Sequence, residues 1–374
     1  MGFIEEAAPG GLPVATQTSA MLHRAVTVAF AAVLGIGCSL ATRSLDTHQS
    51  PRRALISRAH VWMSTDVAAQ DLRRGPVLAN GFEPGATVAC EYVEEKMAGS
   101  SPKFACRIGE KDVVKVKFGG TNGEVYAEVA ATRLLWALGF PADRMYPVKV
   151  ICHGCPERIA GVDQANGDRV VDPASIERKY PGHEIREGGE GWSWQELNEV
   201  SEEAGGAPRA QVDALKLVAV FLQHTDSKPV QQRIVCADEK KHEDGCSRTL
   251  LMINDLGMTF GRASRTNSDP PSSSNLDGWS HMPVWKNATG CVGNLPKSLS
   301  GTLADPVISE AGREFLAGLL TQLTDQQLND LFDVARFRLR PRSPGQGASG
   351  FPSTQEWVDA FKAKRAEIVN RRCP

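Results

Sequence analysis

Two acidic residues near the middle of the chain have the types and spacing of a catalytic pair. Asp226 and Lys228 lie in the stretch HTDSKPVQ (residues 224–231), and Asp255 opens an Asp-Leu-Gly tripeptide further along. One carboxylate can orient a hydroxyl group and accept its proton, a second can hold a divalent cation, and an ammonium group can offset developing negative charge. Phosphoryl transfer is one reaction that needs groups of these types.

The flanking sequence predicts the elements that hold these residues. Apolar residues at helical spacing predict a helix that ends near Gln223. They are Val212, Leu215, Val218, Ala219 and Leu222. After the loop, Ile234–Val235 and Leu250–Ile253 read as a buried β-hairpin that leads directly into Asp255. The predicted order is therefore helix, loop, hairpin and acidic tripeptide.

A lysine-bearing strand and an acidic helix precede this region. In the predicted strand Val113–Phe118, Lys115 and Lys117 are two residues apart and therefore point to the same face. A lysine that faces inward needs an anionic partner, whereas on an outer face both would simply be solvated. The next predicted helix carries Glu124 and Glu128 near its start. Taken alone, these two acids would only favour the helix dipole.

A short turn near the start of the folded region could hold phosphate. The segments Thr87–Val93 and Phe104–Ile108 alternate as strands do, and Gly99, Ser100 and Ser101 lie between them. Small residues leave backbone N–H groups accessible to an anion. An ordinary hairpin loop is the alternative interpretation.

Taken together, these motifs resemble the protein kinase-like superfamily. The stretches 224–231 and 255–257 keep the order and spacing of the kinase catalytic loop, His-Arg-Asp-x-Lys-x-x-Asn, followed by Asp-Phe-Gly. The turn Gly-Ser-Ser-Pro-Lys (99–103) is similar to the Gly-x-x-Pro-Lys loop of the HipA-type serine kinases. The resemblance implies an α+β fold with two lobes. A small antiparallel-sheet N-lobe with one helix would span 86–155, and a mainly helical C-lobe 156–340.

The resemblance also implies the catalytic and metal-binding roles. Asp226 would orient the acceptor hydroxyl or act as its base, and Lys228 would offset charge. Asp255 would bind Mg²⁺ together with Gln231, which stands where the family has Asn. Gln keeps the amide oxygen but is one methylene longer, and magnesium tolerates little distortion. This substitution is the main argument against activity.

The same resemblance assigns the residues that would bind ATP. Lys117 is expected to contact the phosphates, with Lys115 as the second choice, and to pair with the helix residue Glu128, which matches better than Glu124. The phosphate-covering turn would consist of Gly99, Ser100 and Ser101.

Three functions remain open from the sequence. The first is an ATP- and Mg²⁺-dependent phosphotransferase whose partners are the nucleotide and an unknown protein or small-molecule acceptor, and transfer of a nucleotidyl group would use much the same residues. The second is a catalytically silent kinase-like binding module, which Gln231 and an exported location favour because ATP is usually scarce outside the cell. The third, ranked last, is a disulfide-stabilised structural protein with accidental motif matches.

Other segments are predicted from pattern alone. Residues 156–208 are polar and glycine-rich, with one short helix behind a capping box at Ser193. The strand Met145–Cys152 is expected to run toward the hinge between the lobes. Residues 261–274 have the composition and position of an activation segment, and two helices are expected within 309–339. Residues 341–374 read as a linker followed by a C-terminal helix.

Length and charge limit the range of functions. The chain has 374 residues, 41% of them hydrophobic, which allows one large domain or two small lobes. Its formal net charge is -2. The composition therefore lacks the excess of Lys and Arg that nucleic-acid-binding proteins carry, and no nucleic-acid partner is expected.

The N-terminal region is typical of an exported protein. Residues 1–43 contain a basic start at Met21–Arg24 and an apolar run over Ala25–Ala41, which predicts a signal peptide. An uncleaved membrane anchor is the alternative, and it is the single way in which a membrane association is expected. Residues 44–85 lack sustained periodicity and are predicted to be a linker with at most a short helix. The expected location is periplasmic or extracellular.

Cysteine usage agrees with export. Of the 9 cysteines, Cys38 falls in the predicted signal peptide, which leaves an even number for an oxidising compartment. Proximity in sequence suggests four pairs, although eight cysteines allow about 105 connectivities. These pairs are Cys90 with Cys106, Cys152 with Cys155, Cys236 with Cys246, and Cys291 with Cys373.

Overall fold

The computed structural model describes residues 51–156, 158–159, 162–163, 167–186, 188–238, 246–261, 273–298, 301–343 and 349–374. The predicted signal peptide and most of the expected activation segment lie outside these residues. The chain separates into Met1–Thr47 and His48–Pro374, and the second unit carries every described residue.

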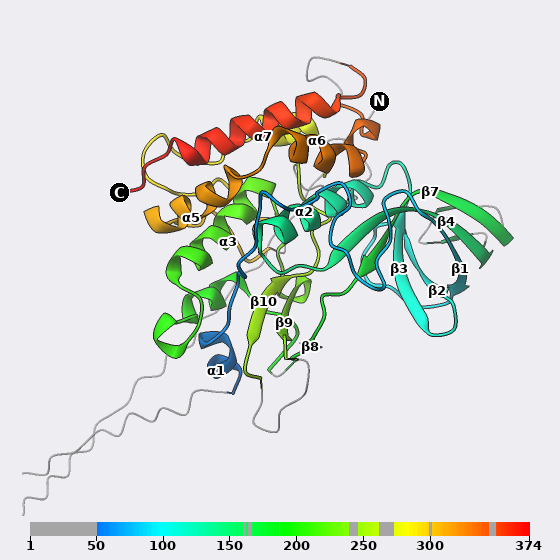
Figure 1. Ribbon diagram of the computed structural model, residues 1–374, viewed down its shortest axis with the longest axis horizontal. Coiled ribbons are helices and arrows are strands. Elements are labelled where there is room, and N and C mark those ends of the chain that lie inside the picture. The colour runs from blue at the N-terminus through cyan, green and yellow to red at the C-terminus, as the bar shows by residue number, and fades with distance from the viewer. Residues whose placement is uncertain are drawn as a thin grey trace, which may run out of the picture. The chain divides into compact units, whose positions relative to one another are not determined.

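Five strands close into a barrel. In spatial order they are β1 (Thr87–Val93), β2 (Lys103–Ile108), β3 (Asp112–Phe118), β7 (Gly167–Arg178) and β4 (Arg144–Cys155). Alternate residues of β3, such as Val114 and Val116, belong to the core enclosed by the strands, whereas Lys115 and Lys117 point outward into a cleft. Figure 1 shows the barrel strands grouped at one side of the described chain.

The barrel corrects two sequence-based expectations. The sheet is not wholly antiparallel, because β1 pairs with β4 in parallel and thereby closes the barrel. Residues 156–208 contain β7 as well as the short helix Trp194–Glu199 that the capping box predicted. Because charged and polar residues alternate with apolar ones in β7, its segment reads as polar. β7 pairs with β3 and β4, so it is β7 rather than β4 that leaves the barrel toward the rest of the chain.

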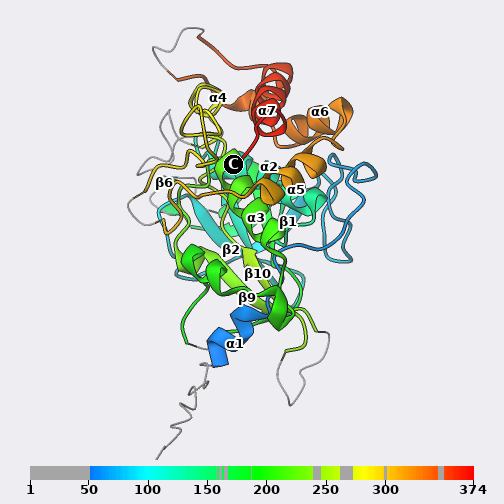
Figure 2. The same ribbon diagram turned by 90° about the vertical axis from the view of Figure 1, so that its left-hand side faces the viewer.

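The helices form a second, larger hydrophobic core. They are α1 (Pro51–Ser57), α2 (Glu124–Leu138), α3 (Arg209–Leu222), α4 (Leu276–Ser280), α5 (Glu310–Leu320), α6 (Asp325–Val334) and α7 (Thr354–Val369). α3 packs on α5, and α7 packs on α5 and α6, as Figure 2 also shows. The pair α5 and α6 agrees with the two helices expected within 309–339. The architecture is α+β, as the sequence predicts.

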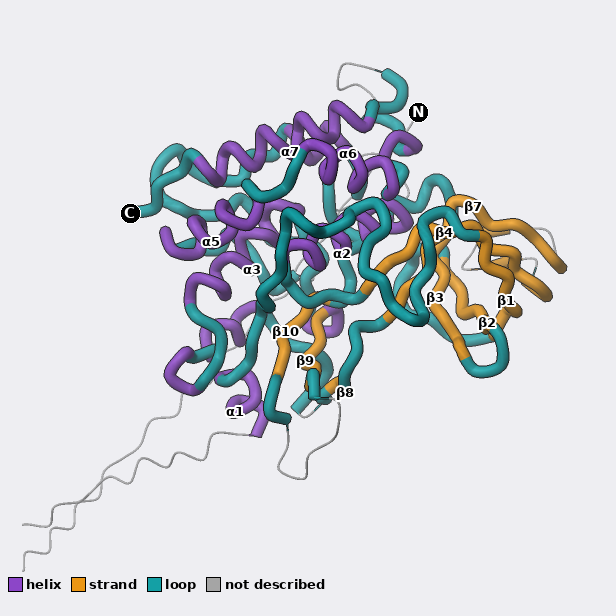
Figure 3. Tube along the Cα trace, in the orientation of Figure 1, coloured by secondary structure: helices purple, strands orange, loops and turns teal. Residues whose placement is uncertain are grey.

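Helix α2 lies between the two cores. It contacts β4 and β7 of the barrel on one side and α6 on the other, and Figure 3 shows it where strands give way to helices. Its buried apolar side chains, from Val125 to Leu138, belong to the larger core. Gly139 ends the helix at φ 86, as a left-handed cap.

Short strands flank the loops that carry Asp226 and Asp255. β9 (Gln232–Cys236) and β10 (Thr249–Ile253) form the predicted antiparallel hairpin, and β8 (His183–Glu184) extends it at the β9 edge. Two further short strands, β5 (Arg158–Ile159) and β6 (Val162–Asp163), pair with each other. Since β10 ends at Ile253, Asp255 follows directly from a buried strand. Helix α3 ends at Gln223, which has φ 58, and the chain turns there into the loop that carries Asp226.

The segment expected to be a linker is partly a structural element. Ile56, Val61 and Val67 are buried in the larger core, and the His60 carbonyl accepts a hydrogen bond from Leu251 N–H at 2.9 Å. Apolar residues spaced without helical or strand periodicity form this packed, irregular stretch, so pattern alone does not reveal it.

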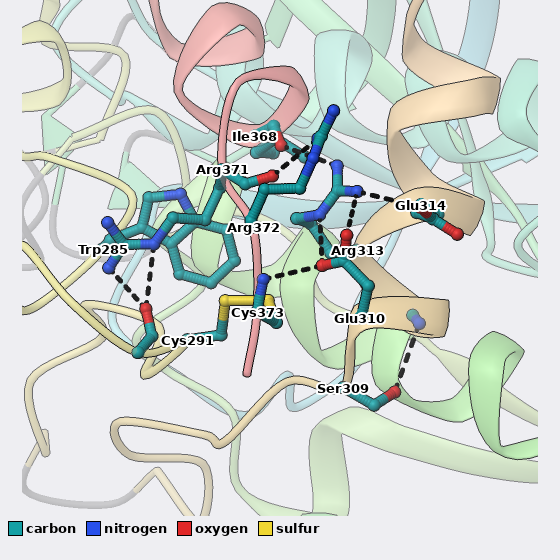
Figure 4. Close-up of a disulfide and its surroundings, with 12 residues drawn as sticks. Trp285, Cys291, Ser309, Glu310, Arg313, Glu314, Ile368, Arg371, Arg372 and Cys373 are labelled. Carbon is teal, nitrogen blue, oxygen red and sulfur yellow. Dashed lines mark hydrogen bonds and ion pairs between the residues drawn. A yellow bond between two sulfur atoms is a disulfide. The ribbon is translucent and has the colours of Figure 1, made fainter.

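All four predicted cysteine pairs form disulfides. Cys90–Cys106 joins β1 to β2, and Cys291–Cys373 joins the residues after α7 to a distant loop, as Figure 4 shows. These bonds fit the oxidising compartment that the cysteine count suggested. Within the described parts of the chain, none of the helices combines the length and apolar character that crossing a bilayer requires.

Candidate active site

The predicted site residues converge on one cleft of about 1590 Å³. Its walls are the outer face of the barrel, the start of α2, and the loops after α3 and β10. Eight of the nine predicted residues line it, namely Gly99, Ser100, Ser101, Lys117, Asp226, Lys228, Gln231 and Asp255. The ninth, Glu128, is buried behind Lys117, with 2% of its surface exposed.

Lys117 is the electrostatic centre of this cleft. Its Nζ lies 2.6 Å from Glu128 Oε1, 2.6 Å from Glu124 Oε2 and 3.7 Å from Asp255 Oδ1. Burial by itself would lower the pKa of Lys117, but these carboxylates together raise its pKa well above the ordinary value. Lys117 is therefore held as a cation, and the ion pair with Glu128 expected from the sequence is present.

The carboxylates around Lys117 differ in their environments. Burial raises the pKa of Glu128 well above its ordinary value, although Lys117 opposes this. Burial acts in the same direction on Asp255, but Lys117 outweighs it and holds the pKa of Asp255 below the usual range. The Asp255 side chain is 33% exposed, so an ionised carboxylate faces the cleft.

Asp226 and Asp255 are linked through Gln231. The Gln231 Nε2 group donates to Asp226 Oδ2 at 2.7 Å and lies 3.5 Å from Asp255 Oδ2. Lys228 also contacts Asp226, since its Nζ lies 3.4 Å from Asp226 Oδ1. The stretch Pro229–Gln231 is a single turn of 3-10 helix, which points Gln231 back at Asp226.

Gln231 has an orientation that differs from the one expected of a metal ligand. Its Oε1 accepts a hydrogen bond from Lys228 N–H at 3.3 Å, so the amide oxygen is turned away from Asp255 and the amide nitrogen faces both carboxylates. Exchanging the two amide atoms would set a donor against the Lys228 N–H. Gln231 therefore bridges the acids in this conformation, and its longer side chain is what reaches across.

The turn before β2 closes the cleft on the barrel side. Ser101 Oγ donates to Glu124 Oε2 at 2.9 Å, and Lys103 Nζ lies 3.2 Å from Ser101 Oγ. Gly99 has φ +85, and a Cβ there would meet Lys103 Nζ at 2.8 Å. The backbone conformation favours glycine at this position, whereas the flexible end of Lys103 can move aside for a Cβ.

His224 is the first residue of the stretch 224–231, which carries Asp226. It is fully buried, packs edge-on against the Trp194 ring, and neither ring nitrogen has a hydrogen-bond partner among the described residues. Burial lowers its pKa to about 4. The neutral imidazole therefore acts as a packing residue. Trp192 and Trp194 are likewise buried, which agrees with a role in packing and not with stacking on a ligand.

Among the further residues of the cleft, Glu124 and Lys115 were second choices from the sequence, and Lys103 had no assigned role. Glu124 contacts Lys117 as closely as Glu128 does, and a signal existed, since the two acids are four residues apart and share one helix face. Lys103 lies opposite Lys117 in the β2–β3 pairing, which depends on a register that the sequence does not define. Lys115 also lines the cleft, but it forms an ion pair with Glu177 of β7.

No protein-family model matches the chain, and no curated protein matches it in sequence. Among solved structures, the chain is similar to the crystal structure of a Helicobacter pylori proinflammatory kinase, CtkA, with a TM-score of 0.42 and 10% sequence identity. This likeness covers 77% of the present chain and 96% of that chain. At this TM-score and identity it carries no argument about function.

Proposed function

We propose that this protein is an exported, ATP- and Mg²⁺-dependent phosphotransferase with a protein kinase-like fold, which acts on the hydroxyl group of a protein or small-molecule acceptor. The observation that carries the proposal is a chain of contacts in one cleft. Lys117 forms a buried ion pair with Glu128, and its Nζ lies 3.7 Å from Asp255 Oδ1. Gln231 links Asp255 to Asp226.

Each contact suits a part of phosphoryl transfer, which depends on positioning and charge stabilisation. Lys117 is a fixed cation that binds phosphate oxygens, and the turn at Ser101 covers them. Asp226 orients the acceptor hydroxyl and accepts its proton while the hydroxyl oxygen bonds to the γ-phosphorus. The bond from that phosphorus to the β,γ-bridging oxygen breaks, and ADP leaves. Lys228, beside Asp226, offsets the charge on the transferred group.

The donor set fits magnesium in part. Asp255 offers an ionised carboxylate that faces the cleft, which is the kind of ligand that Mg²⁺ prefers. The Gln231 amide oxygen would add a second ligand if it no longer accepted from Lys228 N–H. Bound magnesium would neutralise negative charge on the phosphates.

A catalytically silent nucleotide-binding module is the second candidate. The observation that favours it is the Gln231 amide nitrogen, which donates to Asp226 and so occupies the carboxylate that the acceptor hydroxyl would need. Nucleotidyl transfer would use the same residues as phosphoryl transfer, and the identity of the product, ADP or pyrophosphate, separates the two reactions.

Turnover with Asp226→Asn tests the proposal. ATP consumption and product identity are measured with Mg²⁺ and a panel of protein and hydroxyl acceptors. We expect the variant to bind ATP but to lose about 100-fold or more of the rate, since a positioned base contributes about 10² to 10⁴. Asp168→Asn is the matched control, because Asp168 is exposed, pairs with His153 and lies outside the cleft.

Two results would reject the catalytic assignment. ATP binding by the wild-type protein with no turnover on any acceptor would favour the silent module. Turnover that is the same in Asp226→Asn and in the wild type would show that Asp226 is not the catalytic residue.

A further inference from the structure

We propose that the Glu124 carboxylate occupies the position of a bound phosphate in the resting protein, so that phosphate enters the cleft only when Glu124 leaves Lys117 and Ser101. This inference rests on the proposed nucleotide site and deepens it by naming the residue that limits affinity for phosphate. Glu124 thereby controls ligand binding without taking part in the transfer step.

Two donors converge on a single oxygen of Glu124. Lys117 Nζ lies 2.6 Å from Glu124 Oε2, and Ser101 Oγ donates to the same oxygen at 2.9 Å. An ammonium group on a strand and a hydroxyl group on a small-residue turn are a natural pair of ligands for a phosphate oxygen. In this conformation both are already bound to an anion.

The two glutamates that hold Lys117 are not equivalent. The Glu128 side chain is 3% exposed and comes from the second turn of α2, whereas the Glu124 side chain is 12% exposed and begins the helix. Glu128 is buried behind Lys117 and does not line the cleft. Glu124 can swing toward the open cleft, and Lys117 then keeps Glu128 as its partner. Glu124 is therefore the exchangeable anion of the pair.

The Glu124 side chain lies between Gly257 and Ser101. Its Cγ and Cδ lie against Gly257, where a Cβ would come within 2.6 Å of Cγ, so a glycine at this position is what makes room for the carboxylate. Lys103 lies on the far side of Ser101, with Nζ 3.2 Å from Ser101 Oγ. When a phosphate replaces the carboxylate, Lys103 is placed to add a second cation near it.

Electrostatics determine the consequence. A phosphate oxygen cannot take the position of Glu124 Oε2 while the carboxylate is there, because Ser101 has one hydroxyl proton to donate and two anions at one position repel each other. Binding must therefore include the free energy of displacing Glu124. Removing the charge of Glu124 should tighten phosphate binding. If Glu124 were instead a metal ligand, its removal would weaken Mg²⁺-dependent binding.

The test compares Glu124→Gln with the wild type in the oxidised full chain. Isothermal titration measures binding of ATP with Mg²⁺, and separately of inorganic tripolyphosphate without metal. We expect about tenfold tighter binding of both ligands by Glu124→Gln, as for loss of one competing charged contact. Glu95→Gln is the control, because Glu95 is exposed on the same cleft and the change removes the same charge away from Lys117.

Each outcome separates this inference from the proposed function. Tighter binding of both ligands by Glu124→Gln, with no change in Glu95→Gln, supports both. If Glu124→Gln weakens ATP binding or leaves it unchanged, the nucleotide site stands and the role of Glu124 is overturned. Equal tightening in Glu124→Gln and Glu95→Gln also overturns the role of Glu124. Tighter tripolyphosphate binding with no ATP binding in either protein supports the inference and rejects an ATP site. No binding of either ligand overturns both.

Discussion

At the scale of single residues, His224 joins the stretch 224–231 to the core. Its ring is fully buried next to Trp194, and its backbone N–H donates to the Ala219 carbonyl at the end of α3. Asp226 is the second residue after it. A charged imidazole in this position would have no hydrogen-bond partner among the described residues, so the loop depends on the neutral form.

We predict that acid destabilises the protein through His224. Its pKa falls from 6.5 in the unfolded chain to about 4 in the folded protein, so between these values the unfolded state binds more protons. Stability is therefore full above pH 6.5 and is lost as the pH falls toward 4. The expected loss is about 3 kcal/mol.

Chemical denaturation between pH 7 and pH 4 measures this loss. His224→Phe keeps a planar ring and removes the titrating group, so its free energy of unfolding should fall by about 3 kcal/mol less than that of the wild type over this range. Parallel curves for the two proteins would show that His224 does not titrate between these values.

At the scale of elements, the C-terminal helix is fastened at its end. The capping box of Ser193 has a counterpart at Ser353, whose side chain accepts from Glu356 N–H where α7 begins. After α7, Cys373 bonds to Cys291, and Cys373 N–H donates to Glu310 Oε2 at 2.8 Å (Figure 4). Glu310 also holds Arg313 in an ion pair within α5. The end of α7 is thereby tied to α5 and to the loop before it.

Removing this tie should be costly. The Cys291–Cys373 bond closes a sequence separation of 82 residues, compared with 10 for Cys236–Cys246. On the chain-entropy model, the longer loop gives the larger stabilisation. We expect the double substitution of Cys291 and Cys373 by Ser to lower the free energy of unfolding by about 4 kcal/mol, and the same change at Cys236 and Cys246 to lower it by less. Equal losses in denaturant unfolding would contradict this account.

At the scale of the whole molecule, the cleft is built from parts that are far apart in the sequence. The barrel supplies Lys117, α2 supplies both glutamates, and the loops after α3 and β10 supply Asp226 and Asp255. Since α2 packs in the larger core and also touches the barrel, it fixes the two glutamates relative to both walls. A shift of α2 would therefore change the partners of Lys117.

Much of this arrangement could be predicted from local pattern. Helical and strand periodicity located α2, α3 and the β9–β10 hairpin, and the motif order brought Lys117, Glu128 and Asp255 together. The barrel could not be predicted in this way, because the polar residues of β7 conceal a strand that long-range pairing stabilises. The orientation of Gln231 and the contact of Ser101 with Glu124 depend on side-chain geometry, on which sequence spacing is silent.

The measurement that tests the central claim most directly is thermal unfolding of the oxidised protein, with and without ATP and Mg²⁺. A ligand that binds the folded state alone must raise its stability. We predict a clear Mg²⁺-dependent rise in Tm that Asp255→Ala abolishes and Asp168→Asn retains. No rise at millimolar ATP, or a rise that Asp255→Ala leaves intact, would contradict the proposal that this cleft binds a nucleotide through Asp255.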